Sequence, residues 1–193
     1  MANKDQLIID KVLQGNSNAF AELVNTYKDL VFSLAIKMTK NKEVAEEVSQ
    51  DTFIKAYKNL ANFKGDSKFS TWLYKITYHN CLDEFKKNER KYKTATIDED
   101  FSLNLKSSDD VLKTIEKEDR AKMMKICLEE LPKEEKTILW LFYFKELSLK
   151  EIQTITNFSE ANIKVKLHRA RKRLLGIVEK RFEPEMIAHY GKK

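Results

Sequence analysis

The sequence predicts an all-α protein with two small helical domains joined by an acidic linker, the second domain a helix-turn-helix. Its 193 residues include four glycines and two prolines, too few for the tight turns of a sheet-rich fold. Apolar residues recur at three- and four-residue spacing, which is the period of an amphipathic helix. Charged residues make up 34% of the chain, and we find neither an apolar run of about 18 residues nor a signal peptide. We therefore expect a cytoplasmic protein.

The first half of the chain predicts three long helices, and together they form an expected domain over residues 1–93. Apolar spacing places the first helix over residues 17–39, and a second follows at residues 44–60. After a polar turn, Ser70 is a good N-cap for a third helix, which ends in a basic run near Lys93.

The second half begins after a segment with no helical period. Residues 94–112 contain five acidic residues and one basic residue, so we interpret them as an extended linker with too little apolar surface to fold alone. Helical spacing then resumes. The expected elements are a helix leading up to Pro132, helices at residues 133–144, 148–156 and 160–181, a domain over residues 113–182, and a tail at 183–193.

The last two of these helices resemble a helix-turn-helix. Ser148 and Glu151 have the spacing of a capping box, and a short turn leads to Ser159, which we expect to cap the last helix. An apolar seam on that helix leaves other faces cationic, as a recognition helix requires. A solvated basic surface helix is the alternative. The cations are Lys164, Lys166, His168, Arg169, Arg171, Lys172 and Arg173.

The third helix combines aromatic and basic residues, which suits single-stranded DNA because rings stack on unpaired bases while cations follow the backbone. The alternative is that the rings belong to the core. By spacing we assign Phe69, Trp72, Leu73 and Ile76 to the core. We expect Lys75, Tyr74 and Tyr78 to be more exposed and to contact DNA, together with the basic run that includes Lys86, Lys87 and Arg90.

The second helix carries an acidic face that would repel nucleic acid. Glu46, Glu47, Gln50 and Asp51 lie within about one and a half turns, which indicates a protein-docking surface or simply a solvated face. Cys81 and Cys127 are far apart and no CxxC is present, so neither a disulfide framework nor a zinc site is indicated. No catalytic motif occurs.

Four segments in order carry a family resemblance: AEEVSQDTFIKAY, FKGDSKFSTWLYKIT, LPKEEKTILWLFYFKELSLKEI and NIKVKLHRARKRL. Together they resemble a group 4, extracytoplasmic-function RNA polymerase sigma factor, over about residues 20–182. The resemblance implies a factor that binds core RNA polymerase and directs promoter-specific initiation. It implies no catalytic residue, no cofactor or metal, and no small-molecule substrate.

The resemblance also implies three sets of site residues. The acidic face docks on the β′ clamp helices through Glu47, Gln50 and Asp51, and the β flap is a second polymerase contact. The third helix and the loop before it open the minus-ten element through Phe63, Lys64, Tyr74, Lys75, Tyr78, His79, Asn80, Asp83, Lys86, Lys87 and Arg90. The minus-thirty-five element is read as duplex through Ser159, Asn162, Lys164, Lys166, His168, Arg169, Arg171 and Lys172.

Two positions depart from the family pattern. His79 stands where the family usually has Asn and is followed by Asn80, so the polar contact to the flipped base comes from one or the other. Val165 stands where the family often has Ser, which removes one hydrogen bond. An anti-sigma factor is a further implied partner.

The rival interpretation is a one-component helix-turn-helix regulator that binds duplex DNA without polymerase. It would require a dimerisation or effector domain, whereas the first ninety or so residues carry the aromatic and acidic arrangement instead. An enzyme with a basic surface is a third interpretation, which the absence of a catalytic motif disfavours.

Overall fold

The computed structural model describes residues 4–94 and 123–181, with the backbone alone for residues 88–94. Every regular element in these ranges is a helix, as the sequence predicts. The described part of the predicted linker is Thr94 alone; residues 95–112 and the 183–193 tail lie outside the described residues. Contacts divide the chain into an N-terminal unit, residues 1–96 with 147–160, and a C-terminal unit, residues 97–146 with 161–193.

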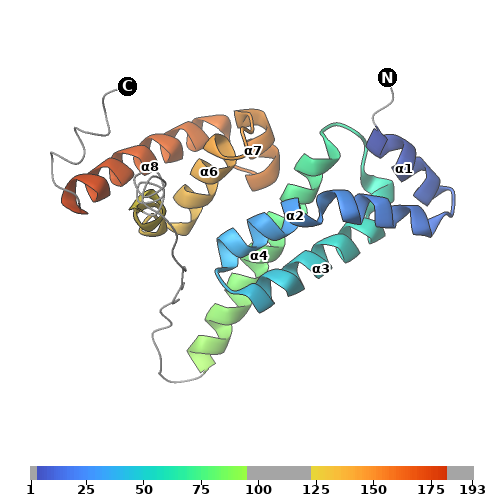
Figure 1. Ribbon diagram of the computed structural model, residues 1–193, viewed down its shortest axis with the longest axis horizontal. Helices are drawn as coiled ribbons and strands as arrows, with labels where there is room; N and C mark the ends of the chain where they lie inside the picture. The colour runs from blue at the N-terminus through green and yellow to red at the C-terminus, as the bar shows by residue number, and fades with distance from the viewer. Residues whose placement is uncertain (1–3, 95–122, 182–193) are drawn as a thin grey trace, which may run out of the picture. The chain divides into compact units, whose positions relative to one another are not determined.

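The N-terminal unit is a helical bundle in which α2, α3 and α4 pack against one another (Figure 1). Apolar side chains from all three helices meet in its core, where Leu23, Val31, Ala56 and Leu73 have at most a trace of exposed surface. The α-helices of this unit are α1 (Lys4–Leu13), α2 (Phe20–Thr39), α3 (Lys42–Lys58), α4 (Phe69–Thr94) and α7 (Leu149–Thr156), and two short 3-10 helices lie at Ser17–Ala19 and Leu60–Asn62.

Local chemistry sets the junction between α2 and α3. Lys40 adopts the left-handed conformation, with φ of 58°, and ends α2. Asn41 then caps α3, because its side-chain oxygen accepts a hydrogen bond from the Val44 amide at 2.9 Å. Two long helices therefore turn back on each other within a few residues.

Two features of this unit differ from the sequence prediction. Helix α1 was not predicted; it buries Ile8 and Ile9 in the core, and Asp5 accepts a hydrogen bond from the Tyr27 hydroxyl at 2.7 Å. The predicted N-cap at Ser70 is wrong, since α4 already begins at Phe69. Phe69 is buried among core side chains, and its anchoring starts the helix earlier.

The C-terminal unit contains a helical segment at residues 123–129, α6 (Lys133–Tyr143) and most of α8 (Glu160–Arg181). Leu128, Leu131 and Leu139 pack with Ala170 of α8 to form its core. Lys136 is buried and pairs with Glu129, Nζ to Oε2, at 2.8 Å, which satisfies its charge away from water. Among the described helices, none is long and apolar enough to cross a membrane.

Candidate nucleic-acid interface

A cavity of about 580 Å³ opens beside α4 in the N-terminal unit, within the size range of small-ligand pockets. Its walls come from the end of α3, the loop that precedes α4, one side of α4 and a single residue of α7. The lining residues are Lys55, Asn59, Asn62, Phe63, Lys64, Asp66, Ser67, Trp72, Lys75, Ile76, His79, Asn80, Asp83 and Thr154.

Aromatic rings form the apolar side of this cavity. The Phe63 and Trp72 rings lie 5.3 Å apart at 50°, and both pack with Phe69, which anchors them to the core. Gly65 has φ of 77°, which an L side chain rarely adopts, so the loop depends on glycine there. Two half-buried rings at the edge of a polar cavity are suited to stacking on an unpaired base.

Asn80 lines the cavity, and protein groups occupy its amide. Its Nδ2 donates to Thr52 Oγ1 at 3.1 Å, and its Oδ1 accepts from Lys55 Nζ at 2.6 Å. The side chain is 7% exposed. Asn80 therefore holds α3 to α4 and orients Lys55.

His79 is the more accessible of the two neighbouring polar residues and is half-buried at the cavity wall. Burial lowers the pKa of His79, and the charge of Lys75 lowers it further. The ring is therefore favoured in its neutral form, in which one nitrogen donates and the other accepts. A neutral imidazole of this kind can read the hydrogen-bonding edge of a base.

The expectation that Tyr74 and Tyr78 are exposed is wrong. Their side chains are 3% and 2% exposed, and burial raises the pKa of Tyr74 to about 12. At helical spacing they lie on the side of α4 that carries buried Cys81, so they extend the core. Phe69 and Leu73 are buried, and Trp72 and Ile76 pack against the same core while lining the cavity.

The other predicted residues of this surface divide by position. Lys64, Asp83, Lys86 and Lys87 are exposed. Asp83 and Lys86 are 3.9 Å apart, Oδ1 to Nζ, and Lys87 Nζ lies 3.3 Å from Glu84 Oε2. Arg90 lies within α4, and its side chain is outside the described part. Lysines thus continue from the cavity along α4, as a path for a phosphate backbone requires.

The acidic face of α3 is exposed. Glu46, Glu47, Gln50 and Asp51 all lie at the surface, while Ala45, Val48 and Thr52 of the same helix are buried. Glu47 and Asp51 are one turn apart and form one ridge. We call this ridge the acidic ridge; it is accessible to a protein partner.

Helix α8 separates its cations into an outward face and two flanks. Ile163, Leu167 and Ala170 are buried, and the opposite side exposes Lys164, Val165, His168, Arg169 and Lys172. On the flanks, Lys166 Nζ pairs with Glu134 Oε2 at 2.6 Å, Arg173 Nη1 lies 3.6 Å from Glu135 Oε2, and Arg171 stacks over Tyr143 at 5.4 Å.

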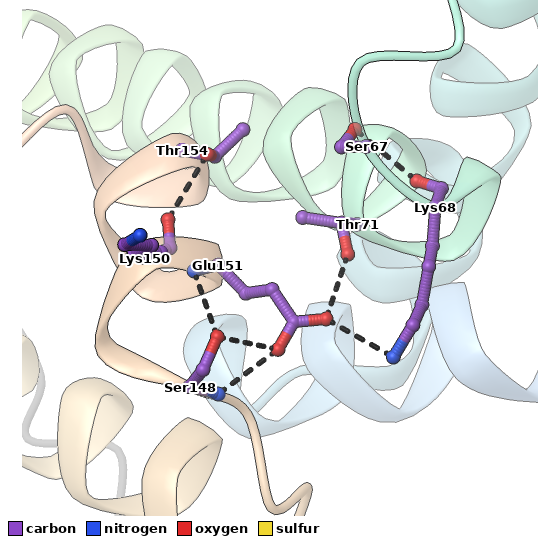
Figure 2. Close-up of polar contacts among 7 residues, drawn as sticks. All are labelled: Ser67, Lys68, Thr71, Ser148, Lys150, Glu151 and Thr154. Atoms are coloured by element: carbon purple, nitrogen blue, oxygen red, sulfur yellow. Dashed lines mark hydrogen bonds and ion pairs between the residues drawn. The ribbon is translucent and has the colours of Figure 1, made fainter.

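The first helix of the helix-turn-helix, α7, is capped as the sequence predicts. Ser148 and Glu151 form a reciprocal capping box at the start of α7 (Figure 2), and Asn157 ends α7 in the left-handed conformation, with φ of 61°. Ser159 and Asn162, the remaining predicted residues, are exposed just before α8 and in its first turn.

Several residues that line the cavity were not among the predicted DNA contacts. Lys55 belongs to the helix interpreted as acidic, and Trp72 and Ile76 were assigned to the core alone. The basic residue one turn beyond Asp51 is the signal that could have identified Lys55. Helical spacing could not place Asn59 and Asn62 at the cavity, because α3 ends before them. Among the described residues, no cluster of His, Cys, Asp and Glu could hold a metal ion.

Comparison with known proteins agrees with this arrangement. Residues 23–91 match Sigma-70 region 2, and residues 124–174 match Sigma-70 region 4. The ECF RNA polymerase sigma factor SigW of Bacillus subtilis is 33% identical over 86% of this chain and 92% of its own length. SigM of the same organism is 32% identical over 79% of this chain and 91% of its own length.

Solved structures share the fold. The sigma factor RpoE of Bartonella quintana, in complex with the anti-sigma factor NepR, has a TM-score of 0.65 at 19% identity and covers 84% of this chain and 98% of its own. CnrH, in complex with the cytosolic domain of CnrY, has a TM-score of 0.63 at 20% identity and covers 93% of this chain and all of its own. Two family regions in order and relatives matched along nearly their whole length establish that this chain belongs to the extracytoplasmic-function (group 4) sigma factors of RNA polymerase, which direct transcription initiation.

Proposed function

We propose that the cavity beside α4 holds one unpaired base of the minus-ten element while this sigma factor opens the promoter. The observation that carries the proposal is the meeting of two rings, Phe63 and Trp72, with the neutral-favoured His79 in one cavity. Rings stack on a flipped base, and the imidazole reads its edge. Asn80 is buried, with its amide held by Thr52 and Lys55, whereas His79 is half-buried at the cavity wall, so His79 is the residue of the two that contacts the base.

Phosphate contacts on either side of this base come from lysines. Lys64 and Lys75 border the cavity, and Lys86 and Lys87 lie exposed further along α4. These cations steer and hold the backbone without reading sequence. They give the melted strand a continuous path away from the base pocket.

The outward face of α8 reads the minus-thirty-five element as duplex. Lys164, His168, Arg169 and Lys172 are exposed on it, whereas Lys166 is held by Glu134. We expect residues near the start of α8 to reach base edges and later cations to bind phosphate. The exposed methyl groups of Val165 suit an apolar contact, such as a thymine methyl.

The acidic ridge on α3 docks on core polymerase, at the β′ clamp helices, and the C-terminal unit supplies a second contact at the β flap. Exposed carboxylates without nucleic-acid function are suited to a basic protein surface. An anti-sigma factor is a further proposed partner, because the similar RpoE was solved with one.

The factor itself supplies specificity and strand opening, and polymerase supplies the nucleotidyl transfer. We therefore propose a non-enzymatic protein without cofactor that works in the cytoplasm. Its functional division follows the sequence domains: residues 1–93 for core binding and the minus-ten element, 94–112 as a connector, and 113–182 for the minus-thirty-five element.

In vitro transcription on a randomised promoter library tests the proposal. With core polymerase and this chain, initiation should select a two-part element, and Phe63→Ala or His79→Ala should lower strand opening, measured by permanganate reactivity of unpaired thymines. Glu22→Ala, at an exposed position of α2, is the matched control. Specific duplex binding without any polymerase-dependent initiation would instead support the one-component regulator.

A further inference from the structure

Within the C-terminal unit, carboxylates at the start of α6 pair with cations on one flank of α8. Lys166 Nζ lies 2.6 Å from Glu134 Oε2. Two helical turns further along α8, Arg173 Nη1 lies 3.6 Å from Glu135 Oε2. Both carboxylates belong to the first turn of α6, and a separation of seven residues places the two cations on the same side of α8. The helix proposed to read duplex DNA is therefore neutralised along the flank that faces α6.

The contact between Glu134 and Lys166 is the shorter of the two. The Lys166 ammonium donates a hydrogen bond to the carboxylate as well as forming an ion pair with it, and such charge-assisted bonds are roughly twice as strong as neutral ones. The Lys166 side chain is 20% exposed, whereas Lys164, Arg169 and Lys172 of the same helix are exposed. Lys166 thus serves α6, and the outward cations remain accessible to DNA.

The number of cations that reach phosphate has a cost for a sequence-reading helix. A lysine on the DNA backbone strengthens binding to every sequence, because phosphates carry no sequence information. Each phosphate contact also steepens the fall of log affinity with log salt by about 0.9. A factor that must find its promoter among many other sites depends on the ratio of specific to nonspecific affinity. Phosphate contacts that form only outside the promoter complex lower that ratio.

We propose that Glu134 is a specificity-determining residue, which withholds Lys166 from DNA phosphate and so limits the binding of α8 to sequences other than the promoter. The inference rests on the proposed role of α8 as the reader of duplex DNA. In the promoter complex, base contacts hold the outward face of α8 in the groove, so its Lys166 flank stays toward α6. On other sequences no base contact fixes the helix, and a released Lys166 is able to turn to the backbone.

Fluorescence anisotropy of the full chain on two duplexes tests the proposal. One duplex carries the minus-thirty-five sequence selected by the transcription assay, and the other is a scrambled duplex of the same composition. Glu134→Gln should tighten binding to the scrambled duplex by up to about eightfold at about 0.1 M salt and steepen its salt slope by about 0.9, as one added phosphate contact does. Binding to the selected duplex should stay unchanged. Glu179→Gln, an equal charge change at an exposed position near the end of α8, is the control and should alter neither.

A double-mutant cycle tests whether the effect acts through Lys166. While Glu134 is present, Lys166 makes no phosphate contact, so Lys166→Gln alone should leave the salt slope on the scrambled duplex unchanged. Combining Glu134→Gln with Lys166→Gln restores the native net charge and should return the slope to its native value. The two substitutions are then strongly non-additive, as expected for residues in direct contact. Additive effects, with a shallower slope for Lys166→Gln alone, overturn the proposal.

Zero-length cross-linking of the native chain follows the pair without any substitution. Carbodiimide joins a lysine to a carboxylate in contact, so the full chain should give a Lys166–Glu134 isopeptide, detected by mass spectrometry. Lys42–Glu46, 3.8 Å apart within α3, is the internal reference. The yield of the first product should persist when scrambled duplex is added to saturation, because Lys166 stays with Glu134. Loss of that product on DNA with the reference intact, or its absence from the free chain, overturns the proposal.

The remaining outcomes separate this inference from the proposed function of α8. An equal gain from Glu134→Gln on both duplexes, or an unchanged slope on the scrambled one, rejects control of specificity by Glu134. Weaker binding to the selected duplex alone means that the pair only braces α8 against α6, and it also overturns the proposal. If the transcription assay selects no minus-thirty-five sequence, the reading role of α8 fails, whereas the salt slope on scrambled duplex still reports whether Lys166 is withheld.

Discussion

His79 and Asn80 are adjacent on α4, yet their side chains face different surroundings. Asn80 is buried between Thr52 and Lys55, and His79 is half-buried at the cavity wall. A helical turn of about 100° per residue separates consecutive side chains in this way. The two polar residues look interchangeable in sequence, but Asn80 has a structural role and His79 has a proposed DNA-binding role.

Substitution at each position should separate these roles. Asn80→Ala leaves the buried Thr52 hydroxyl without its amide donor and Lys55 without its acceptor, so we expect the free energy of unfolding to fall by about 1–3 kcal/mol. His79→Ala should leave unfolding nearly unchanged and lower promoter opening roughly fivefold, the loss of one net hydrogen bond. Urea unfolding and permanganate footprinting measure the two quantities. The reverse pattern would assign base contact to Asn80.

The lowered pKa of His79 predicts a pH dependence of stability. Between the lowered pKa of His79 in the folded state and the ordinary value of 6.5, the folded state binds fewer protons than the unfolded state. The contribution of neutral His79 to stability is therefore complete above pH 6.5 and decreases as the pH falls from 6.5 toward the folded-state pKa. The effect is small, since the ring is only half-buried. Groups near the ring are Lys55, Lys75, Asp83, Lys86, Asn157 and the backbone of Ile155.

Unfolding at about pH 8 and about pH 5.5 measures this dependence. Trp72 fluorescence in a Trp140→Phe background reports the N-terminal unit alone, because the second tryptophan belongs to the other unit. The difference in unfolding free energy between this protein and its His79→Gln variant should decrease at the lower pH. A constant difference would mean that His79 titrates alike in the folded and unfolded chains.

At the scale of the element, α3 combines a buried face with the acidic ridge. Asp51→Arg should weaken binding to core polymerase by several kcal/mol, because repulsion replaces attraction at a complementary surface. Stability should hardly change, since the side chain is exposed. Glu22→Arg on α2 makes the same charge change at another exposed position. Equal capture of core polymerase by both variants would refute docking through this ridge.

The outward face of α8 predicts two kinds of DNA contact. Loss of a base-reading Arg169 should cost about 1–3 kcal/mol and relax specificity at one promoter position, whereas loss of a phosphate-bound Lys164 should weaken all sequences and reduce the salt slope by about 1. Binding of holoenzyme to minus-thirty-five variants at several salt concentrations distinguishes them. A uniform loss for both substitutions would exclude base reading by Arg169.

The sequence predicted a helix well where apolar residues recur at helical spacing and a capping residue precedes them. Ser148 and Glu151 identified the start of α7, because a capping box is local chemistry. Tyr74 and Tyr78 were misassigned because periodicity along one helix does not say how many neighbours surround it. The cavity was only partly predicted. Lys55 and Thr154 come to it from other helices than α4, and residue spacing within one helix does not show which residues of other helices lie beside it.

At the scale of the whole molecule, each contact unit contains one buried cysteine. Cys81 lies in the N-terminal unit and Cys127 in the C-terminal unit. Burial raises the pKa of Cys81 to about 12 and, with the nearby Glu130 charge, raises that of Cys127. Native thiols should therefore react slowly with a disulfide reagent, because the thiolate is the nucleophile.

Thiol labelling in increasing urea should then report each unit by itself. If the units unfold independently, Cys81 and Cys127 should become reactive at different midpoints, read by peptide mass spectrometry. Coincident midpoints would indicate one cooperative transition. Cys81→Ala and Cys127→Ala provide the single-thiol controls. Rapid labelling of either thiol without urea would contradict its burial.

The two oxygens of Glu151 have separate tasks, one in the capping box of α7 and the other toward Lys68 and Thr71. Most substitutions there would remove the capping box and the contact with α4 together. Glutamine is the exception, since it still serves a capping box. A glutamate codon becomes a glutamine codon by a single base change. A single base change therefore removes the charge that faces Lys68 and leaves the cap of α7 in place.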